Sequence, residues 1–176
     1  MRVIVGVTGA SGVTVAKRLI EELRKKKIET KVIVSDSAKL VMKEEGVSIK
    51  SDYDEKNMAA DLSSSSNRID AFVICPCSVK TLGGIAHGYT DNLIARLADN
   101  CLKMRRKLIL CVRETPYSLI HIKNMELVTL AGAIVMPLNV AYYFKPRKIE
   151  DVTDFFVGKI FDLLEINHNL YRRWKG

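Results

Sequence analysis

The sequence Arg2-Val-Ile-Val-Gly-Val7 runs straight into Thr8-Gly-Ala-Ser-Gly12, so that an apolar, β-branched run is followed by a turn of small residues. Such a run predicts a buried strand, and the glycines predict a tight turn after it. Apolar residues then recur at helical spacing from Val13 to about Lys26, and Thr30-Lys-Val-Ile-Val34 is a second strand-like run. Because a helix separates the two strands, the sequence predicts a right-handed βαβ unit.

The same alternation continues along the chain. Strands are expected at 71–75, 107–112 and 133–136, and helices at 38–45, 79–86, 91–104, 118–130 and 149–164. Five strands alternating with helices predict an α/β fold, with a doubly wound, mostly parallel sheet of the Rossmann-like or flavodoxin-like kind and helices on both faces. We expect one domain over residues 1–176. Polar residues interrupt the pattern between 47 and 67, which indicates a mobile loop over a site or a disordered segment.

Composition limits the class of ligand and the location. The 176 residues include 28 Lys plus Arg against 20 Asp plus Glu, a net charge of +8 that favours an anionic ligand. The basic residues form no long tract with interleaved aromatics, which argues against nucleic acid. With no apolar run long enough to span a bilayer and no signal-peptide pattern, we expect a cytoplasmic protein away from membranes. The four cysteines lie in apolar or helical patterns, typical of buried reduced thiols.

Four strand-to-helix turns carry small, polar or cationic residues. Ligands of doubly wound sheets bind outside the carboxyl ends of the strands, where these turns lie. The turns are Gly6-Val-Thr-Gly-Ala-Ser-Gly12, Ser35-Asp-Ser37, Cys75-Pro-Cys-Ser-Val-Lys-Thr81 and Val112-Arg-Glu-Thr-Pro116. In the first, small residues let backbone N–H groups approach an anion, and the next helix adds partial positive charge. Its glycine spacing matches neither the dinucleotide fingerprint nor a P-loop.

The third and fourth turns supply stronger phosphate ligands. Ser78, Lys80 and Thr81 start a helix, where hydroxyl and N–H groups bind phosphate oxygens. Arg113 ends a strand just before a helix, which directs a bidentate guanidinium into the same crevice. The alternative for Arg113 is a surface ion pair with Glu114. We favour the ligand role.

Asp36, in the second turn, allows a different function. A carboxylate at this place binds ribose hydroxyls in nicotinamide enzymes, so Asp36 is compatible with a nicotinamide reductase. The alternative is a helix N-cap formed by Asp36 or Ser37, which we favour.

Taken together, these segments resemble the flavin prenyltransferase family of the flavoprotein decarboxylase-like superfamily. The resemblance covers almost the whole chain. It rests on Thr8–Gly12, Cys75–Leu82, Ala86-His-Gly-Tyr-Thr-Asp-Asn-Leu93, Ala95-Arg-Leu-Ala-Asp99, Arg113–Pro116, Gly132-Ala-Ile-Val-Met-Pro137 and Tyr142-Tyr-Phe-Lys-Pro146. The order and spacing of these segments are jointly specific to that family.

The resemblance implies a role for particular residues. FMN binding is expected at Gly9, Ala10, Ser11, Ser35, Ser78, Val79, Lys80, Thr81 and Arg113, and catalytic roles at Ser11, Glu45 and Arg113. The phosphate of the prenyl donor is expected at Tyr143 and Lys159, with Arg96 and Lys103 at further basic positions of the site. Relatives commonly carry arginine where this chain has Lys159, which keeps the charge but lacks the fork geometry.

The implied activity joins a dimethylallyl group from dimethylallyl phosphate to N5 and C6 of reduced FMN, without a metal. The family also implies a homo-oligomer, a dodecamer with sites at subunit interfaces, whose product serves a separate reversible decarboxylase. Donor chain length and phosphate number stay open. Alternatives are an FMN-dependent oxidative decarboxylase of the superfamily and a non-catalytic flavin carrier. Those decarboxylases carry a Pro-Ala-Ser-Ala-Asn-Thr-like motif where this chain has Pro76-Cys-Ser-Val-Lys-Thr81, so we rank prenyl transfer first.

Overall fold

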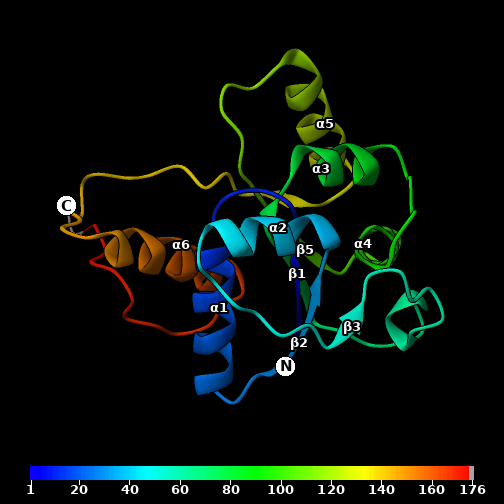
Figure 1. Ribbon diagram of the computed structural model, residues 1–176, viewed down its shortest axis with the longest axis horizontal. Coiled ribbons are helices and arrows are strands. Elements are labelled where there is room, and N and C mark those ends of the chain that lie inside the picture. The colour runs from blue at the N-terminus through cyan, green and yellow to red at the C-terminus, as the bar shows by residue number, and fades with distance from the viewer. Residues whose placement is uncertain (175–176) are drawn as a thin grey trace.

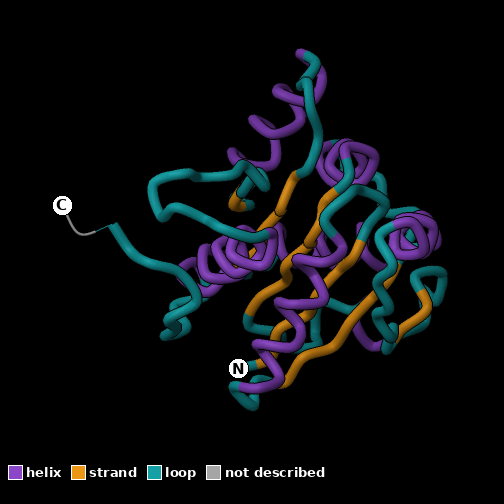
Figure 2. The backbone as a smooth tube through the Cα atoms, turned by 60° about the vertical axis from the view of Figure 1, so that its left-hand side comes forward, coloured by secondary structure: helices purple, strands orange, loops and turns teal. Residues whose placement is uncertain are grey.

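Six parallel strands form one sheet in the order β3-β2-β1-β4-β5-β6 in the computed structural model, which describes residues 1–174 (Figures 1 and 2). The strands are β1 (Arg2–Val7), β2 (Glu29–Val34), β3 (Tyr53–Asp54), β4 (Ala71–Cys77), β5 (Lys107–Val112) and β6 (Ile134–Val135). The chain runs from β1 outward to β2 and β3, then returns to the other side of β1 for β4 to β6. The doubly wound α/β fold is therefore confirmed.

Helices cover both faces of the sheet because successive strand residues point to opposite sides. Val5 packs in one hydrophobic cluster with α1 (Val13–Lys25), α2 (Asp36–Glu44) and α6 (Ile149–Leu163). Ile4, its neighbour, packs in the other cluster. That cluster includes α3 (Val79–Ala86), α4 (Leu93–Lys103), α5 (Leu119–Leu130) and the 3₁₀ turn η1 (Asp61–Ser63).

The segment between 47 and 67 is packed, so the alternative of a disordered segment was wrong, whereas its mobility stays a prediction. It contributes β3, a sixth strand that the count of five did not include, and it places Leu62 in the core at 1% exposure. Arg106 donates to the carbonyls of Ser65 and Asn67 at 2.7 Å each, and Asn100 donates to that of Ser63 at 2.9 Å. These hydrogen bonds satisfy the backbone of the polar run, which therefore needs no regular structure.

Backbone contacts bring the ends of the four central strands together. Ser35 N–H donates to the carbonyl of Val7 at 3.0 Å, and Ser78 N–H donates to Thr8 Oγ1 at 2.8 Å. Arg113 N–H donates to the carbonyl of Cys77 at 3.2 Å. The turns after β1, β2, β4 and β5 are thus fixed side by side at one edge of the sheet.

The cysteines are buried and free, as expected. Desolvation by burial raises the pKa of Cys77 and Cys111 well above the usual thiol value and that of Cys101 to about 12. These three thiols therefore stay protonated and unreactive at neutral pH. As to membranes, the helices within residues 1–174 include none with the length and apolar character to cross a bilayer.

Candidate active site

A cavity of about 790 Å³ opens at the carboxyl edge of the sheet. All nine residues expected to bind FMN line it: Gly9, Ala10, Ser11, Ser35, Ser78, Val79, Lys80, Thr81 and Arg113. Val41 and Ile94 add apolar surface, which suits the face of a flat ring. The four turns selected from the sequence therefore meet in one place.

Close backbone approach shapes the first turn. A Cβ on Gly9 would lie 2.6 Å from both Cβ and Oγ of Ser37, so only glycine lets the turns after β1 and β2 pack this closely. Gly12 has φ +103°, a left-handed value that also favours glycine. The first wall of the cavity thus depends on two glycines.

Glu45 occupies the N-terminus of α1. Its Oε1 accepts from Ser11 Oγ at 2.8 Å and from Gly12 N–H at 2.7 Å, while Oε2 accepts from the Thr14 N–H and hydroxyl at 3.3 Å each. The carboxylate therefore satisfies N–H groups that the sequence offered to a phosphate. Since Ser11 lines the cavity, the same contact also connects Glu45 to the cavity.

The start of α3 remains open for an anion. Ser78 caps this helix, its Oγ accepting from Thr81 N–H at 3.3 Å and lying 3.1 Å from Thr81 Oγ1. The N–H groups of Val79 and Lys80 lie in the first helical turn, where the helix has no carbonyl for them. Lys80 itself pairs with Asp91 at 3.0 Å, so its charge faces the rim. Backbone N–H groups and hydroxyls at this helix start are therefore available to a phosphate.

Arg113 lines the same cavity and is half-buried. The alternative pairing with Glu114 does not form among residues 1–174, because Glu114 Oε1 instead accepts from Thr115 N–H at 2.9 Å. Within this part of the chain, no carboxylate lies within ion-pair distance of Arg113. Its guanidinium is therefore available to an anionic ligand.

Glu55 is a cavity residue that the sequence reasoning missed. It is 8% exposed, and its carboxylate accepts from Asp36 N–H at 2.6 Å and from the Asn92 side-chain amide at 3.3 Å. The residue belongs to the polar segment that was expected to be loose, and nothing in its local pattern indicates burial. It ties α2 to the start of α4 beside the cavity.

The second turn provides a different N-cap for α2 than the sequence predicted. Ser35 Oγ accepts from Ala38 N–H at 3.1 Å, so Ser35, rather than Asp36 or Ser37, is the N-cap of α2. Asp36 instead pairs with Lys39 at 2.7 Å and Lys56 at 2.6 Å. Hydrogen bonds from these two lysines lower the pKa of the Asp36 carboxyl to about 2. This engaged carboxylate is poorly placed to bind the hydroxyls of a ribose.

We therefore expect Asp36→Asn to leave FMN affinity within about twofold, because exposed ion pairs contribute little. The chain should show no saturable binding of NADH at micromolar concentrations. Flavin fluorescence titration of the wild-type and variant proteins measures FMN affinity, and titration followed by NADH fluorescence measures NADH binding. Micromolar NADH binding that weakens in Asp36→Asn would restore the nicotinamide reductase hypothesis.

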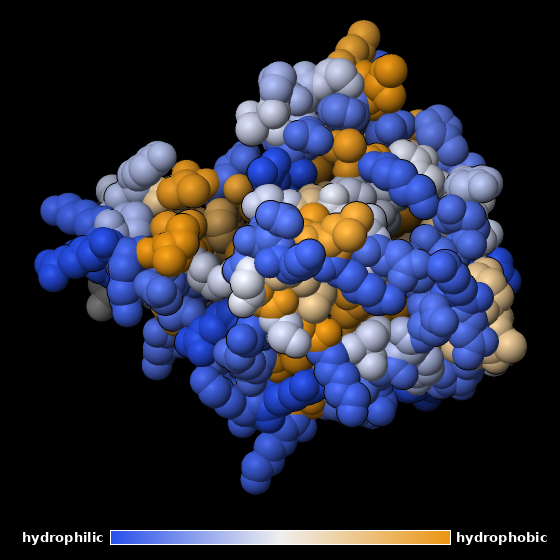
Figure 3. Space-filling view, viewed as in Figure 1, coloured by the Kyte–Doolittle hydropathy of each residue, from blue (hydrophilic) through white to orange (hydrophobic). Residues whose placement is uncertain are grey.

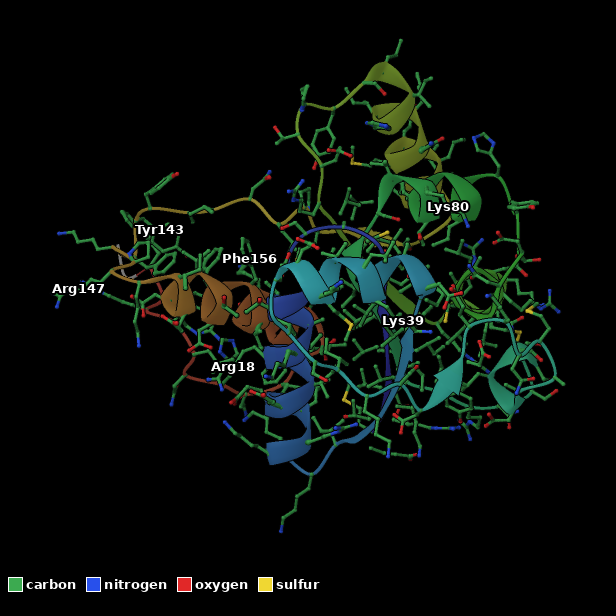
Figure 4. All side chains as sticks on the ribbon, viewed as in Figure 1. Arg18, Lys39, Lys80, Tyr143, Arg147 and Phe156 are labelled. Carbon is green, nitrogen blue, oxygen red and sulfur yellow. The ribbon has the colours of Figure 1, made fainter. Side chains whose placement is uncertain are left out.

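The four residues expected to bind the prenyl donor do not line the cavity of the single chain. Arg96 donates to the Ser63 carbonyl at 3.2 Å, because α4 faces η1, and Lys103 lies 3.9 Å from Asp99. Tyr143 and Lys159 lie at α6, and Figure 4 shows Tyr143 well away from Lys80. One subunit therefore does not bring the expected donor residues to the FMN residues.

Metal-ligating side chains form no cluster in the described part of the chain. Within residues 1–174, no group of three or more His, Cys, Asp or Glu side chains is arranged to hold a metal ion.

Comparison with known proteins places the chain in a family. The Flavoprotein family matches residues 1–166. The flavin prenyltransferase UbiX of Methanocaldococcus jannaschii is 46% identical, with 99% of this chain and 98% of that protein covered. The crystal structure of AnUbiX (PadA1) in complex with FMN and dimethylallyl pyrophosphate superposes with a TM-score of 0.95 at 40% identity, covering 99% and 97% of the chains. A dodecameric FMN-dependent UbiX-like decarboxylase from Escherichia coli O157:H7 has a TM-score of 0.95 at 36% identity over both full chains. The chain belongs to the UbiX flavin prenyltransferase family.

Proposed function

We propose that the protein transfers a dimethylallyl group to N5 and C6 of reduced FMN, making prenylated FMN. The main observation that supports this proposal is that all nine residues expected to bind FMN line one cavity. The family supports it, since UbiX relatives match the chain over nearly its whole length. The chain is accordingly a transferase.

The cavity fits FMN in size and chemistry. Its volume of about 790 Å³ lies within the range of small-molecule sites. The first turn of α3 and Arg113 suit a phosphate, whereas Val41 and Ile94 suit an aromatic ring. Because Gly9 has no Cβ, the turns after β1 and β2, which form part of the cavity wall, can lie this close together.

In the proposed reaction, the carbon–oxygen bond of the donor breaks and phosphate leaves. N5 and C6 of the flavin each lose a proton and gain a bond to carbon, and the middle carbon of the prenyl group takes up one proton. Arg113 stabilises the negative charge that develops on the leaving phosphate. Ser11 can accept a proton lost by the flavin substrate and pass its own to Glu45, 2.8 Å away. Dimethylallyl monophosphate is our proposed donor; the AnUbiX complex holds the pyrophosphate.

The proposal includes an assembly in which neighbouring subunits bring Arg96, Lys103, Tyr143 and Lys159 to the cavity. A dodecameric relative with the same fold supports it. The surface of α5 supports it too, because this helix projects from the body (Figure 1), and Figure 3 shows hydrophobic surface at its outer end. Exposed hydrophobic side chains occur along the whole helix: Leu119, Ile120, Ile122, Leu127 and Leu130, exposed by 43% to 76%. An apolar helix face of this kind suits a second copy of the chain.

The proposal has two further parts, the first from the sequence and the second from the family. We place the protein in the cytoplasm, and we expect a separate reversible decarboxylase to receive its product.

Anaerobic incubation with reduced FMN and dimethylallyl phosphate should yield a flavin heavier by one isoprenyl unit. Mass spectrometry of the extracted flavin measures this directly. Arg113→Ala should reduce the yield of prenylated flavin by about tenfold or more, because it removes a charge-assisted contact to the leaving phosphate of the donor. An unchanged flavin mass, with FMN bound, would exclude this donor and favour another donor, an oxidative decarboxylase or a flavin carrier.

A further inference from the structure

The hydroxyl of Thr8 is buried where the turn after β1 meets the turn after β4. Thr8 is 2% exposed, and its Oγ1 donates to the carbonyl of Pro76 at 2.8 Å. Since this bond uses the single hydrogen of the hydroxyl, the oxygen is an acceptor toward Ser78 N–H, also at 2.8 Å. Thr8 thus supplies both a donor and an acceptor to the segment that leads into α3.

The regular pairing of β1 with β4 ends just before this contact. Gly6 and Ile74 form the last pair, and the register of β4 with β5 shifts between Ile74 and Cys77. Pro76 has no N–H with which to extend a ladder. The Thr8 N–H also donates to the Pro76 carbonyl, at 3.2 Å. On the β1 side, the end of β4 is therefore held by Thr8 rather than by further strand pairing.

The same contact decides which groups at the start of α3 remain for a ligand. Ser78 is the N-cap: its N–H is bonded to Thr8, and its Oγ accepts from Thr81 N–H at 3.3 Å. The next two N–H groups, of Val79 and Lys80, have no carbonyl of the helix as a partner. Thr8 and all four of these α3 residues line the cavity. Fixing Ser78 therefore fixes where the first turn of α3 meets an anion.

We propose that Thr8 is a positioning residue for the phosphate of FMN, because its hydroxyl holds the start of α3, through Ser78, in the arrangement that binds phosphate. This inference deepens the proposed function, since it concerns how the flavin substrate is held. Thr8→Val keeps the shape of the side chain and removes the hydroxyl. The Ser78 N–H then faces a buried methyl group, so the turn must shift to satisfy it. The shift displaces the N–H groups that bind phosphate and leaves the apolar walls of the ring site in place.

The test compares the binding of FMN and riboflavin, which differ only in the phosphate, to the assembled protein after its flavin has been removed. Flavin fluorescence titration measures both dissociation constants. Thr8→Val should raise the dissociation constant of FMN by about tenfold, the loss expected for a weakened hydrogen bond to a charged group. The dissociation constant of riboflavin should change by less than about twofold, because riboflavin makes no phosphate contact. Thr8→Ser keeps the hydroxyl and should bind FMN like the wild type.

Thr153→Val is the matched control. Thr153 is also a buried threonine, 8% exposed, and its hydroxyl donates to the Ile149 carbonyl at 3.1 Å within α6. It lines a separate hollow between α1 and α6. This variant loses a buried hydroxyl too, but it should bind both flavins like the wild type. A merely structural role of Thr8 would weaken FMN and riboflavin alike.

Equal losses for the two flavins, or unchanged FMN affinity in Thr8→Val, would overturn the inference. If Thr8→Val does not fold, Thr8→Cys takes its place, because a thiol is only a weak donor and acceptor and should still weaken FMN more than riboflavin. Failure of the proposed function is a distinct result. The wild type would then bind FMN and leave the flavin mass unchanged with dimethylallyl phosphate, whereas the difference between the two flavins in Thr8→Val would persist.

Discussion

Glu45→Ala is expected to lower the rate of prenyl transfer by about 100-fold or more, the loss typical of removing a general acid or base. The carboxylate accepts from Ser11 Oγ at 2.8 Å, and Ser11 lines the cavity. Without Glu45, a proton taken up by Ser11 has no acceptor. The rate is measured from the mass of the flavin in single-turnover samples with reduced FMN and dimethylallyl phosphate.

The same variant also removes a helix cap, so the two roles of Glu45 must be separated. Loss of the contacts to Gly12 and Thr14 should cost about 1 kcal/mol of stability. Glu45→Gln keeps an oxygen acceptor for these N–H groups but cannot take up a proton at neutral pH. We expect it to melt near the wild type and still to be about 100-fold slow. A glutamine variant with full activity would show that Glu45 only caps α1.

The cofactor side of the site follows from the sequence for a simple physical reason. Parallel strands place all their carboxyl ends at one edge, so a turn after each strand is enough to locate the ligand. Gly9, Ser78 and Arg113 come from turns that lie far apart in the chain, yet all line the cavity. Predicting their place around the cavity needed no knowledge of side-chain packing.

Other parts of the site depend on packing that local patterns do not encode. Glu55 is buried only because Asp36 N–H and Asn92 are positioned to bond it. β3 is two residues long, too short for a periodic signal. The resemblance named Glu45 for proton handling, but its capping of α1 depends on the end of α2 reaching the first turn. Contacts between distant segments decide each of these cases.

The donor residues show a further limit of the sequence. Arg96, Lys103, Tyr143 and Lys159 are predicted by resemblance, but a single chain holds them away from the FMN residues. Motif matching reports that residues share a site without stating which subunit carries each one. Their role therefore stays a prediction that depends on the assembly.

Gly9→Ala is expected to weaken FMN binding by about 30-fold. The new Cβ would lie 2.6 Å from both Cβ and Oγ of Ser37, so the turns after β1 and β2 must separate. Overpacking of this kind costs about 1–3 kcal/mol, and a loss of 2 kcal/mol from the binding-competent form corresponds to about 30-fold in affinity. Flavin fluorescence titration measures the dissociation constant, and thermal melting reports any change in stability.

Two further variants show whether this clash is the cause. Gly84 lies within α3, and the Cβ added by Gly84→Ala would have the Tyr89 carbonyl oxygen as its nearest neighbour, at 3.4 Å. This variant should therefore bind FMN normally. Adding Ser37→Gly to Gly9→Ala removes both atoms at 2.6 Å and should recover most of the affinity. Normal FMN binding by the Gly9→Ala protein would mean that the first turn does not form a wall of the flavin site. A loss that Ser37→Gly leaves unrepaired would instead assign the role of Gly9 to direct backbone contact with the ligand, because the space between the two turns would then be restored without effect.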